Sequence, residues 1–239
     1  MRAARALVMA VCVAAFVMLI ASGPGTRLGL WPWETGLALV KWAAYTGMAG
    51  AVGAVALIVL LVVPRWRVRP WVPLIALCFA LVAFVPPVIL LEQAKKVPNI
   101  HDITTDVFDP PAFNALLAIR KASPNGADYG GPAVAKQQQQ GYPDIKSLVV
   151  KTEPSVTMQK AIDAARSLGW EIVSTDAPTG RIEATDTTTW FGFKDDVVVR
   201  VRPEAAGGSR IDVRSVSRVG SSDVGANAKR VRSFLAKLA

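Results

Sequence analysis

The stretch "DVVVRVRPEAAGGSRIDVRSVSRV", Asp196–Val219, predicts a β-hairpin and decides the class of fold. Successive side chains of a strand point to opposite faces, so Val199 and Val201 face one side while Arg200 and Arg202 face the other. The segment "AAGGS" supplies the small residues of a tight turn, and the alternation resumes in "RIDVRSVSRV". We therefore expect two long antiparallel strands with one apolar face and one face rich in arginine.

Segments on either side of this hairpin extend it into a sheet with two helices. "SLVVKTE", "WEIVSTD" and "RIEATDTTTWF" are typical of strands, and "APTG" joins the last two as a turn. "SVTMQKAIDAARSLG" repeats apolar residues at helical spacing, with Ser155 as its N-cap and Gly169 as its end. A last amphipathic helix begins at Ser222 or Asp223. The order strand, helix, four strands, helix predicts an α+β fold, in which a twisted antiparallel sheet packs against two helices on one face.

The residues before this domain divide into two parts. In "DPPAFNALLAIRKA", Asp109 caps a short helix and Pro110 fits its first turn. "SPNGADYGGPAVAKQQQQG" is rich in Gly, Pro and Gln and predicts a surface loop. We therefore divide the chain into a transmembrane region (1–97), an extended segment with a short helix and a Gly/Pro/Gln-rich loop (98–143), and the α+β domain (144–239).

The transmembrane region holds most of the apolar excess of the chain. Hydrophobic residues make up 52% of the 239 residues, and they are concentrated before Glu92. Three apolar runs, residues 6–22, 42–63 and 71–91, are each close to the length of about 20 residues that crosses a bilayer. The second run carries Gly47, Gly50 and Gly53, whose small size predicts close packing against the other two runs or against a partner protein.

Arginines set the predicted orientation in the membrane. Arg2 and Arg5 precede the first run, and Arg65, Arg67 and Arg69 separate the second run from the third. Positive residues collect on the cytoplasmic side. We therefore expect a protein of the bacterial inner (plasma) membrane with a cytoplasmic N-terminus and a periplasmic C-terminal domain. The start "MRAAR", with the apolar run and "ASG" after it, also resembles a signal peptide, and cleavage there leaves the same domain outside.

Composition excludes several classes of function. The net charge is +9, from 27 Lys+Arg against 18 Asp+Glu, but the predicted topology places the basic domain outside the cytoplasm and away from nucleic acid. The two cysteines, Cys12 and Cys78, lie in apolar runs, so the domain has neither a disulfide framework nor a Cys-based zinc site. No phosphate-binding loop or dinucleotide fingerprint occurs in the sequence. We predict no cofactor and no metal site.

Several blocks of the sequence, in order, resemble a known family. "PNIHDITTD", "YPDI", "LGWEIV", "TGRIEAT" and "WFGFKDDVVVRVRP" are similar to the bacterial and plastid domain-of-unknown-function family 1499, and the similarity covers residues 98–239. The resemblance implies an uncharacterised domain that is often membrane-associated. No catalytic or binding residues are established for the family, so the resemblance assigns none here.

The segment "PNIHDITTD" holds the single histidine of the chain. His101 with Asp102 and Asp106 has the residue types of a general base or a metal site. In an extended segment, however, the histidine faces away from both carboxylates, and a metal site needs three or four converging ligands. We therefore predict that the Asp and Thr side chains bond backbone groups and fix the start of the domain. The three residues remain candidates for binding, and no catalytic residue is predicted.

Two further groups of residues are candidates for binding. Trp190, Phe191 and Phe193 surround a glycine in "TTTWFGFKDD", where they either close one end of the core or, at a hairpin tip, enter the lipid interface or hold a ligand. Arg200 and Arg202 lie on the polar strand face, which either is solvated or binds a phosphate or an acidic envelope polymer.

The function that follows is a non-enzymatic binding or scaffold module, anchored in the membrane and facing the periplasm. Its predicted partners are the lipid bilayer and either an inner-membrane protein complex or an anionic envelope component, and not nucleic acid. The alternative is an envelope enzyme that uses the region of His101, Asp102 and Asp106.

Overall fold

The computed structural model describes residues 2–60 and 71–239, which fall into two units. Unit 1 comprises Met1–Gln93 together with Thr189–Gly192. Unit 2 comprises Ala94–Thr188 and Phe193–Ala239. Arg65, Arg67 and Arg69, on which the predicted orientation depends, lie outside the described residues.

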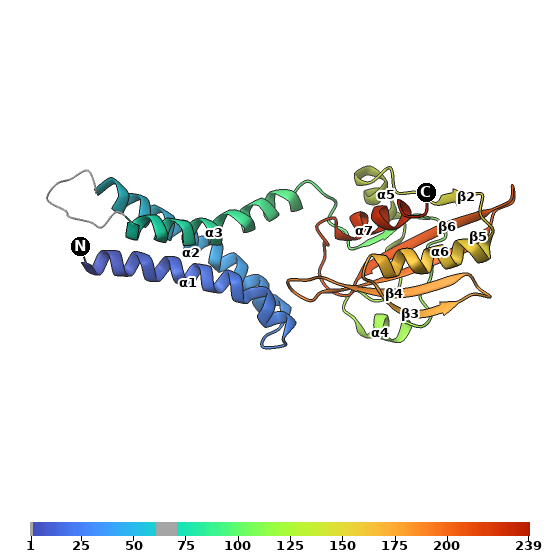
Figure 1. Cartoon of the computed structure of the whole chain (residues 1–239), viewed down its shortest axis with the longest axis horizontal. Coiled ribbons are helices and arrows are strands. Elements are labelled where there is room, and N and C mark those ends of the chain that lie inside the picture. Colours follow the sequence, from blue (N-terminus) through green and yellow to red (C-terminus); the bar gives the residue numbers. More distant parts are fainter. Residues whose placement is uncertain (1, 61–70) are drawn as a thin grey trace. The chain divides into compact units, whose positions relative to one another are not determined.

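Unit 1 is built from three helices, α1 (Arg2–Arg27), α2 (Trp33–Val59) and α3 (Trp71–Ala94) (Figure 1). Each is long and apolar enough to cross a membrane. The residues between the first and second apolar runs, 23–41, are mostly helical, because α1 continues to Arg27 and α2 already begins at Trp33. The hydroxyl of Ser22 donates to the carbonyl of Leu19 (2.6 Å) and that of Thr26 to the carbonyl of Ser22 (3.0 Å), so these polar residues satisfy their hydrogen bonds within α1.

The glycines of α2 pack against the other two helices of the same unit. A Cβ atom placed on Gly47 would lie 2.9 Å from the carbonyl oxygen of Ala80 in α3. A Cβ on Gly50 would lie 2.7 Å from the sulfur of Cys12 in α1. Small residues therefore let the three helices approach closely within one chain, as expected for membrane helices.

Unit 2 contains an antiparallel sheet of the strands β1 (Asp102–Thr104), β2 (Leu148–Val150), β3 (Glu171–Asp176), β4 (Arg181–Thr187), β5 (Lys194–Pro203) and β6 (Ser209–Ser217). The strand order is β1-β6-β5-β4-β3. Strand β2 also pairs with β6, at residues 209–211, whereas β1 pairs with residues 214–216 of the same strand. The predicted hairpin is the pair β5 and β6, in which Val199 lies opposite Val213. The predicted α+β class is confirmed.

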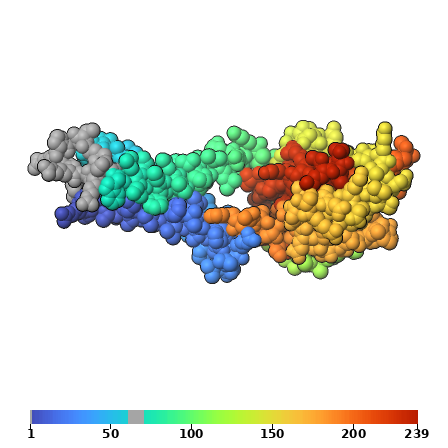
Figure 2. Space-filling view, viewed as in Figure 1, coloured from blue at the N-terminus to red at the C-terminus, as the bar shows by residue number. Residues whose placement is uncertain are grey.

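Helices cover the apolar face of this sheet. Val197, Val199 and Val201 of β5 pack in one core with residues of α6 (Pro154–Ser167) and α7 (Ala226–Leu235). Trp170 stacks on Phe234 of α7, with ring centroids 5.1 Å apart. Figure 2 shows α6, in gold, and α7, in red, next to each other on this side of unit 2. Burial of each such side chain contributes roughly 1.5–3 kcal/mol, which explains why the valine pattern of the hairpin predicted the face correctly.

The polar face of the sheet is covered rather than solvated. The covering segment, residues 105–128, includes α4 (Leu117–Ala122) and places Phe113 and Leu116 against Val198 and Val216. The carboxylate of Glu183 on β4 accepts hydrogen bonds from three consecutive backbone N–H groups of this segment, at 2.7, 3.1 and 2.8 Å. The polar residues on this face are therefore partners of the covering segment, a relationship between distant parts of the sequence that strand periodicity does not reveal.

The Gln-rich stretch is a helix, α5 (Gly131–Gly141), where the sequence predicted a loop. Its Gln138 is buried and its side-chain amide both accepts from the N–H of Thr104 (2.9 Å) and donates to the carbonyl of Thr104 (2.6 Å). Gln138 therefore attaches α5 to the edge of β1, a contact between distant segments that composition alone does not show.

Several helix starts also differ from the prediction. α4 begins at Leu117, so Asp109 does not cap it, and Glu153 rather than Ser155 is the N-cap of α6. α7 begins at Ala226, after a turn in which Asp223 accepts hydrogen bonds from the backbone N–H groups of Gly225 and Asn227. The predicted end of α6 at Gly169 is confirmed, because this glycine has a φ of +80° and its N–H donates to the carbonyl of Arg166.

Candidate functional site

The polar side chains of β5 and β6 meet three aspartates in what we call the arginine–aspartate cluster, which consists of Arg200, Arg202, Arg210, Asp106, Asp109 and Asp212. The arginines come from adjacent antiparallel strands, so strand pairing brings their guanidinium groups together. Asp106 and Asp109 come from the start of the covering segment. The cluster thus joins the sheet to the chain that enters it.

Asp212 lies at the centre of this cluster and is fully buried. One of its carboxylate oxygens accepts hydrogen bonds from Arg202 (2.8 Å) and Arg200 (3.0 Å), and the other accepts from the hydroxyl of Ser147 (2.6 Å). Burial alone would raise the pKa of Asp212, but the hydrogen bonds from Ser147 and Arg200 and the charges of Arg200 and Arg210 hold this pKa below its ordinary value. Asp212 therefore keeps its charge and fixes the arginines in place.

Asp106 and Asp109 complete the charge balance. Asp106 accepts a hydrogen bond from Arg210 (3.0 Å) with one oxygen, and with the other it accepts the backbone N–H groups of Phe108 (3.2 Å) and Asp109 (3.0 Å). The carboxylate of Asp109 contacts Arg200 and Arg202 at 3.0 and 3.1 Å. Three carboxylates therefore oppose three guanidinium groups, and the cluster is a rigid support. The turn that Asp106 makes with Phe108 and Asp109 also fixes the backbone at Phe108.

A groove of about 440 Å³ lies beside this cluster, between the end of β1 and the start of β2. We call it the Phe108 groove; its lining residues include Asp106, Phe108, Gln139, Lys146, Val149 and Arg210. Phe108 is 92% exposed and Val149 is 56% exposed, so both offer apolar surface to solvent. The groove combines an aromatic ring, an amide and two cationic side chains, and this combination suits a ligand with both polar and apolar groups.

A second hollow, of about 450 Å³, adjoins the Phe108 groove. We call it the Tyr129 hollow; it shares Val107, Phe108 and Gln139 with the groove and adds Tyr129 and Lys136. The hydroxyl of Tyr129 is buried without a hydrogen-bond partner, and burial raises the pKa of this phenol to about 12. Phe108 therefore lines two adjoining hollows, and the lining of each also includes a lysine.

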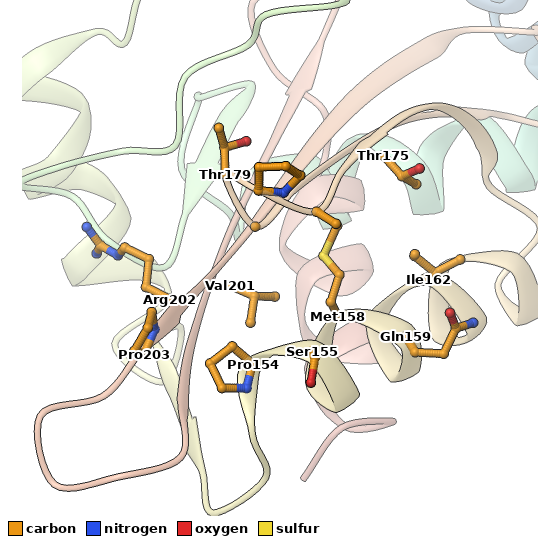
Figure 3. Close-up of a pocket in the computed structure, with 13 residues that line it drawn as sticks. Pro154, Ser155, Met158, Gln159, Ile162, Thr175, Thr179, Val201, Arg202 and Pro203 are labelled. Carbon is orange, nitrogen blue, oxygen red and sulfur yellow. The ribbon is translucent and has the colours of Figure 1, made fainter.

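A third hollow, of about 470 Å³, lies between the start of α6 and the end of β5 (Figure 3). Met158 and Val201 form its centre, and Pro154 and Pro203 lie at one side. The guanidinium group of Arg202 points away from it, toward the arginine–aspartate cluster. This hollow is therefore a largely apolar depression without the cationic groups of the Phe108 groove.

His101 lies apart from Asp102 and Asp106, as the alternation of an extended segment predicts. The ring nitrogen Nδ1 of His101 lies 3.4 Å from the carbonyl oxygen of Ser221. Asp102 is buried and accepts two hydrogen bonds from Arg214, at 2.7 and 3.0 Å, while Asp106 belongs to the arginine–aspartate cluster. Within residues 2–60 and 71–239, no three His, Cys, Asp or Glu side chains are grouped in a way that could hold a metal ion.

The predicted aromatic group is divided between the two units. Trp190 and Phe191 belong to unit 1, where Trp190 lies against Gly23 of α1 and is 44% exposed, and Phe191 lies against Gly36 of α2. Phe193 belongs to unit 2, and its backbone N–H donates to the hydroxyl of Thr188 at 2.9 Å. Phe191 and Phe193 are partly buried.

Sequence reasoning placed Asp106, Arg200 and Arg202 in the candidate set, and the structure joins all three in one cluster. It missed Phe108, Lys136, Gln139 and Lys146, which line the adjoining hollows. A signal for Phe108 was available in "TDVFDPP", since an aromatic residue inside a short Asp- and Pro-rich turn has few ways to reach a core. Nothing local in the sequence pairs this turn with the segment around Lys146.

Comparison with known proteins agrees with the resemblance seen in the sequence. No curated protein matches the chain. The family model described as "Protein of unknown function (DUF1499)" matches residues 102–238, which include every strand of unit 2 and the arginine–aspartate cluster. The match spans more than half of the chain, and the chain therefore belongs to the DUF1499 family.

Proposed function

We propose that this protein is a non-enzymatic binding module of the bacterial inner membrane, whose folded domain faces the periplasm and binds an anionic envelope component in the Phe108 groove. The single observation that carries the proposal is the exposed side chain of Phe108, which lines two adjoining hollows together with Lys146 in one and Lys136 in the other. An exposed aromatic residue beside convergent polar groups is a common feature of binding sites.

The paired charges of the arginine–aspartate cluster support binding rather than catalysis. Its arginines are already paired with carboxylates at 2.8–3.1 Å, which suits a fixed framework. A general base would need a titratable group close to the reacting atoms, and His101, the residue suited to that role, is separated from Asp102 and Asp106. The enzyme alternative therefore has weaker support from the geometry.

The topology part of the proposal rests on arginine placement and on the three apolar helices. Arg2 and Arg5 at the start of α1 favour a cytoplasmic N-terminus. After three crossings the chain leaves the membrane on the opposite side. A domain in that position meets the anionic polymers and lipids of the envelope, and the chain itself carries a net charge of +9.

Binding of the full-length protein to anionic polymers tests this function. The protein in neutral phosphatidylcholine nanodiscs is titrated with polygalacturonate and with polyglutamate at two salt concentrations. We expect salt-sensitive binding that the double variant Lys136→Ala/Lys146→Ala weakens several-fold. The matched control Lys151→Ala/Lys160→Ala removes two exposed lysines that line none of the three hollows described above and leaves affinity unchanged. Absence of binding to both polymers, or equal effects of the two double variants, would refute the proposal.

A further inference from the structure

We propose that the ligand of the Phe108 groove is an acidic polysaccharide, and that one of its sugar rings stacks on Phe108 while its acidic groups reach Lys136 and Lys146. This inference rests on the proposed function and names the chemical class of its ligand. It depends on three features of the described residues: an exposed aromatic face, hydrogen-bonding groups beside it, and cations in both hollows.

The aromatic face is the first feature. Phe108 is held by the turn in which its N–H and that of Asp109 donate to Asp106, so the backbone is fixed while the ring is 92% exposed. A flat apolar surface covers such a ring without any rearrangement of the main chain, which lowers the cost of binding. The face of a sugar ring that carries C–H bonds is such a surface.

Hydrogen-bonding groups are the second feature. Gln139 is exposed and lines both hollows. An amide offers donors and an acceptor at once, which matches the hydroxyl groups of a sugar.

The distribution of charge is the third feature. Lys146 and Arg210 line the Phe108 groove and Lys136 lines the Tyr129 hollow, whereas Asp106 is the acidic residue in the lining of the two. The charge of Asp106 is already opposed by Arg210 at 3.0 Å. The remaining positive charge is divided between the two hollows, so it suits a polymer with repeated acidic groups better than a ligand with a single charge.

The shape of the neighbouring backbone argues against an extended acidic peptide. A peptide would gain most of its affinity by pairing with a sheet edge. Beside the groove that edge is β2, which has only the three residues Leu148–Val150. A ligand that relies on ring stacking and side-chain hydrogen bonds does not need a longer edge.

The test compares a sugar polymer with a peptide polymer of the same charge type. Full-length protein in phosphatidylcholine nanodiscs is titrated with polygalacturonate, polyglutamate and phosphatidylglycerol vesicles, as the parent and as Phe108→Ala, Phe108→Tyr and Val173→Ala. Val173 is a matched control because it is an exposed apolar residue on β3, outside both hollows. We expect Phe108→Ala to weaken polygalacturonate binding by at least about tenfold. Phe108→Tyr and Val173→Ala should keep the affinity of the parent, and Phe108→Ala should change polyglutamate binding by less than about twofold.

The outcomes separate this inference from the proposed function. If polygalacturonate binds and the lysine double variant weakens it but Phe108→Ala does not, the stacking inference is wrong while the binding function stands. If Phe108→Ala weakens polyglutamate or vesicle binding as much as polygalacturonate binding, the ligand class is wrong. If neither polymer binds, the proposed function is wrong, and this inference, which rests on it, is wrong as well. Because Phe108 is exposed, an unchanged circular dichroism spectrum of Phe108→Ala is expected and excludes loss of fold.

Discussion

The side-chain amide of Gln138 hydrogen-bonds both backbone groups of Thr104, accepting from its N–H at 2.9 Å and donating to its carbonyl at 2.6 Å. Both residues are fully buried or nearly so. The amide therefore takes the place of a neighbouring strand on the free edge of β1. It connects α5 to the sheet and fixes the start of the segment that leads to Phe108.

Replacement of Gln138 with alanine should destabilise unit 2 markedly. The change leaves a buried donor and a buried acceptor of Thr104 without partners, at a cost of about 1–3 kcal/mol for each. We expect a loss of roughly 2–4 kcal/mol in the free energy of unfolding, measured by urea denaturation of the full chain in detergent. Gln140→Ala removes an exposed glutamine from the same helix and should change that free energy by less than about 0.5 kcal/mol. Similar results for the two variants would show that the Gln138 bonds do not contribute.

Glu183 should be the main attachment of the covering segment to the sheet. Its buried carboxylate accepts three backbone N–H groups, from Asn114, Ala115 and Leu116. In Glu183→Gln an amide NH₂ group replaces one carboxylate oxygen, so a donor faces a backbone N–H group that previously had an acceptor. Hydrogen bonds to a charged group are worth about 1.5–3 kcal/mol each, and this contribution is also reduced. We expect faster cleavage within residues 105–128 during limited proteolysis, with fragments identified by mass spectrometry.

The control for this experiment is Glu171→Gln, which alters an exposed carboxylate on β3. It should leave the cleavage pattern of the parent unchanged. An identical pattern for Glu183→Gln and the parent would mean that packing of Phe113 and Leu116, rather than the carboxylate, holds the segment.

Asp212 should make the stability of unit 2 depend on acid pH. Its folded-state pKa lies below the ordinary value of 3.8, so folding favours the ionised form. The resulting stabilisation is complete above the unfolded-state pKa and is lost as the pH falls below about 3.8 and through the depressed folded-state pKa. Asp212→Asn should therefore lower the melting temperature at pH 7 and flatten its decrease between pH 4 and pH 2.

The matched control is Asp163→Asn, because Asp163 is an exposed residue of α6 whose carboxylate lies 3.8 Å from Arg166. It should leave the acid dependence of the melting temperature as it is in the parent. If Asp212→Asn retains the full acid dependence, other carboxylates govern this range and the central role given to Asp212 is incorrect.

Local pattern predicted those parts of the fold in which burial follows strand or helix period. Val199, Val201 and Val213 alternate with polar residues, and the predicted hairpin and its apolar face are confirmed. The helix end at Gly169 is also confirmed, because the left-handed backbone conformation there is one that the glycine itself favours. Such features depend on neighbours within a few positions of the chain.

Features that depend on distant partners were not predictable in this way. Gln138 is helical and buried because Thr104 needs its amide, although the surrounding composition is typical of a loop. Arg200 was correctly placed on the polar face, yet its partners Asp109 and Asp212 lie 91 and 12 positions away. The Phe108 groove likewise combines a turn after β1 with residues before β2, and no local signal joins them.

The most direct test of the account concerns the side of the membrane on which the folded domain lies. Alkaline phosphatase, which is active only outside the cytoplasm, and green fluorescent protein, which fluoresces only when it stays in the cytoplasm, are fused in turn after Ala239 of the full chain in a bacterial host. The account predicts an active phosphatase fusion and a dark fluorescent-protein fusion. An inactive phosphatase with a bright fluorescent protein would contradict it, because the domain would then face the cytoplasm, away from any envelope polymer.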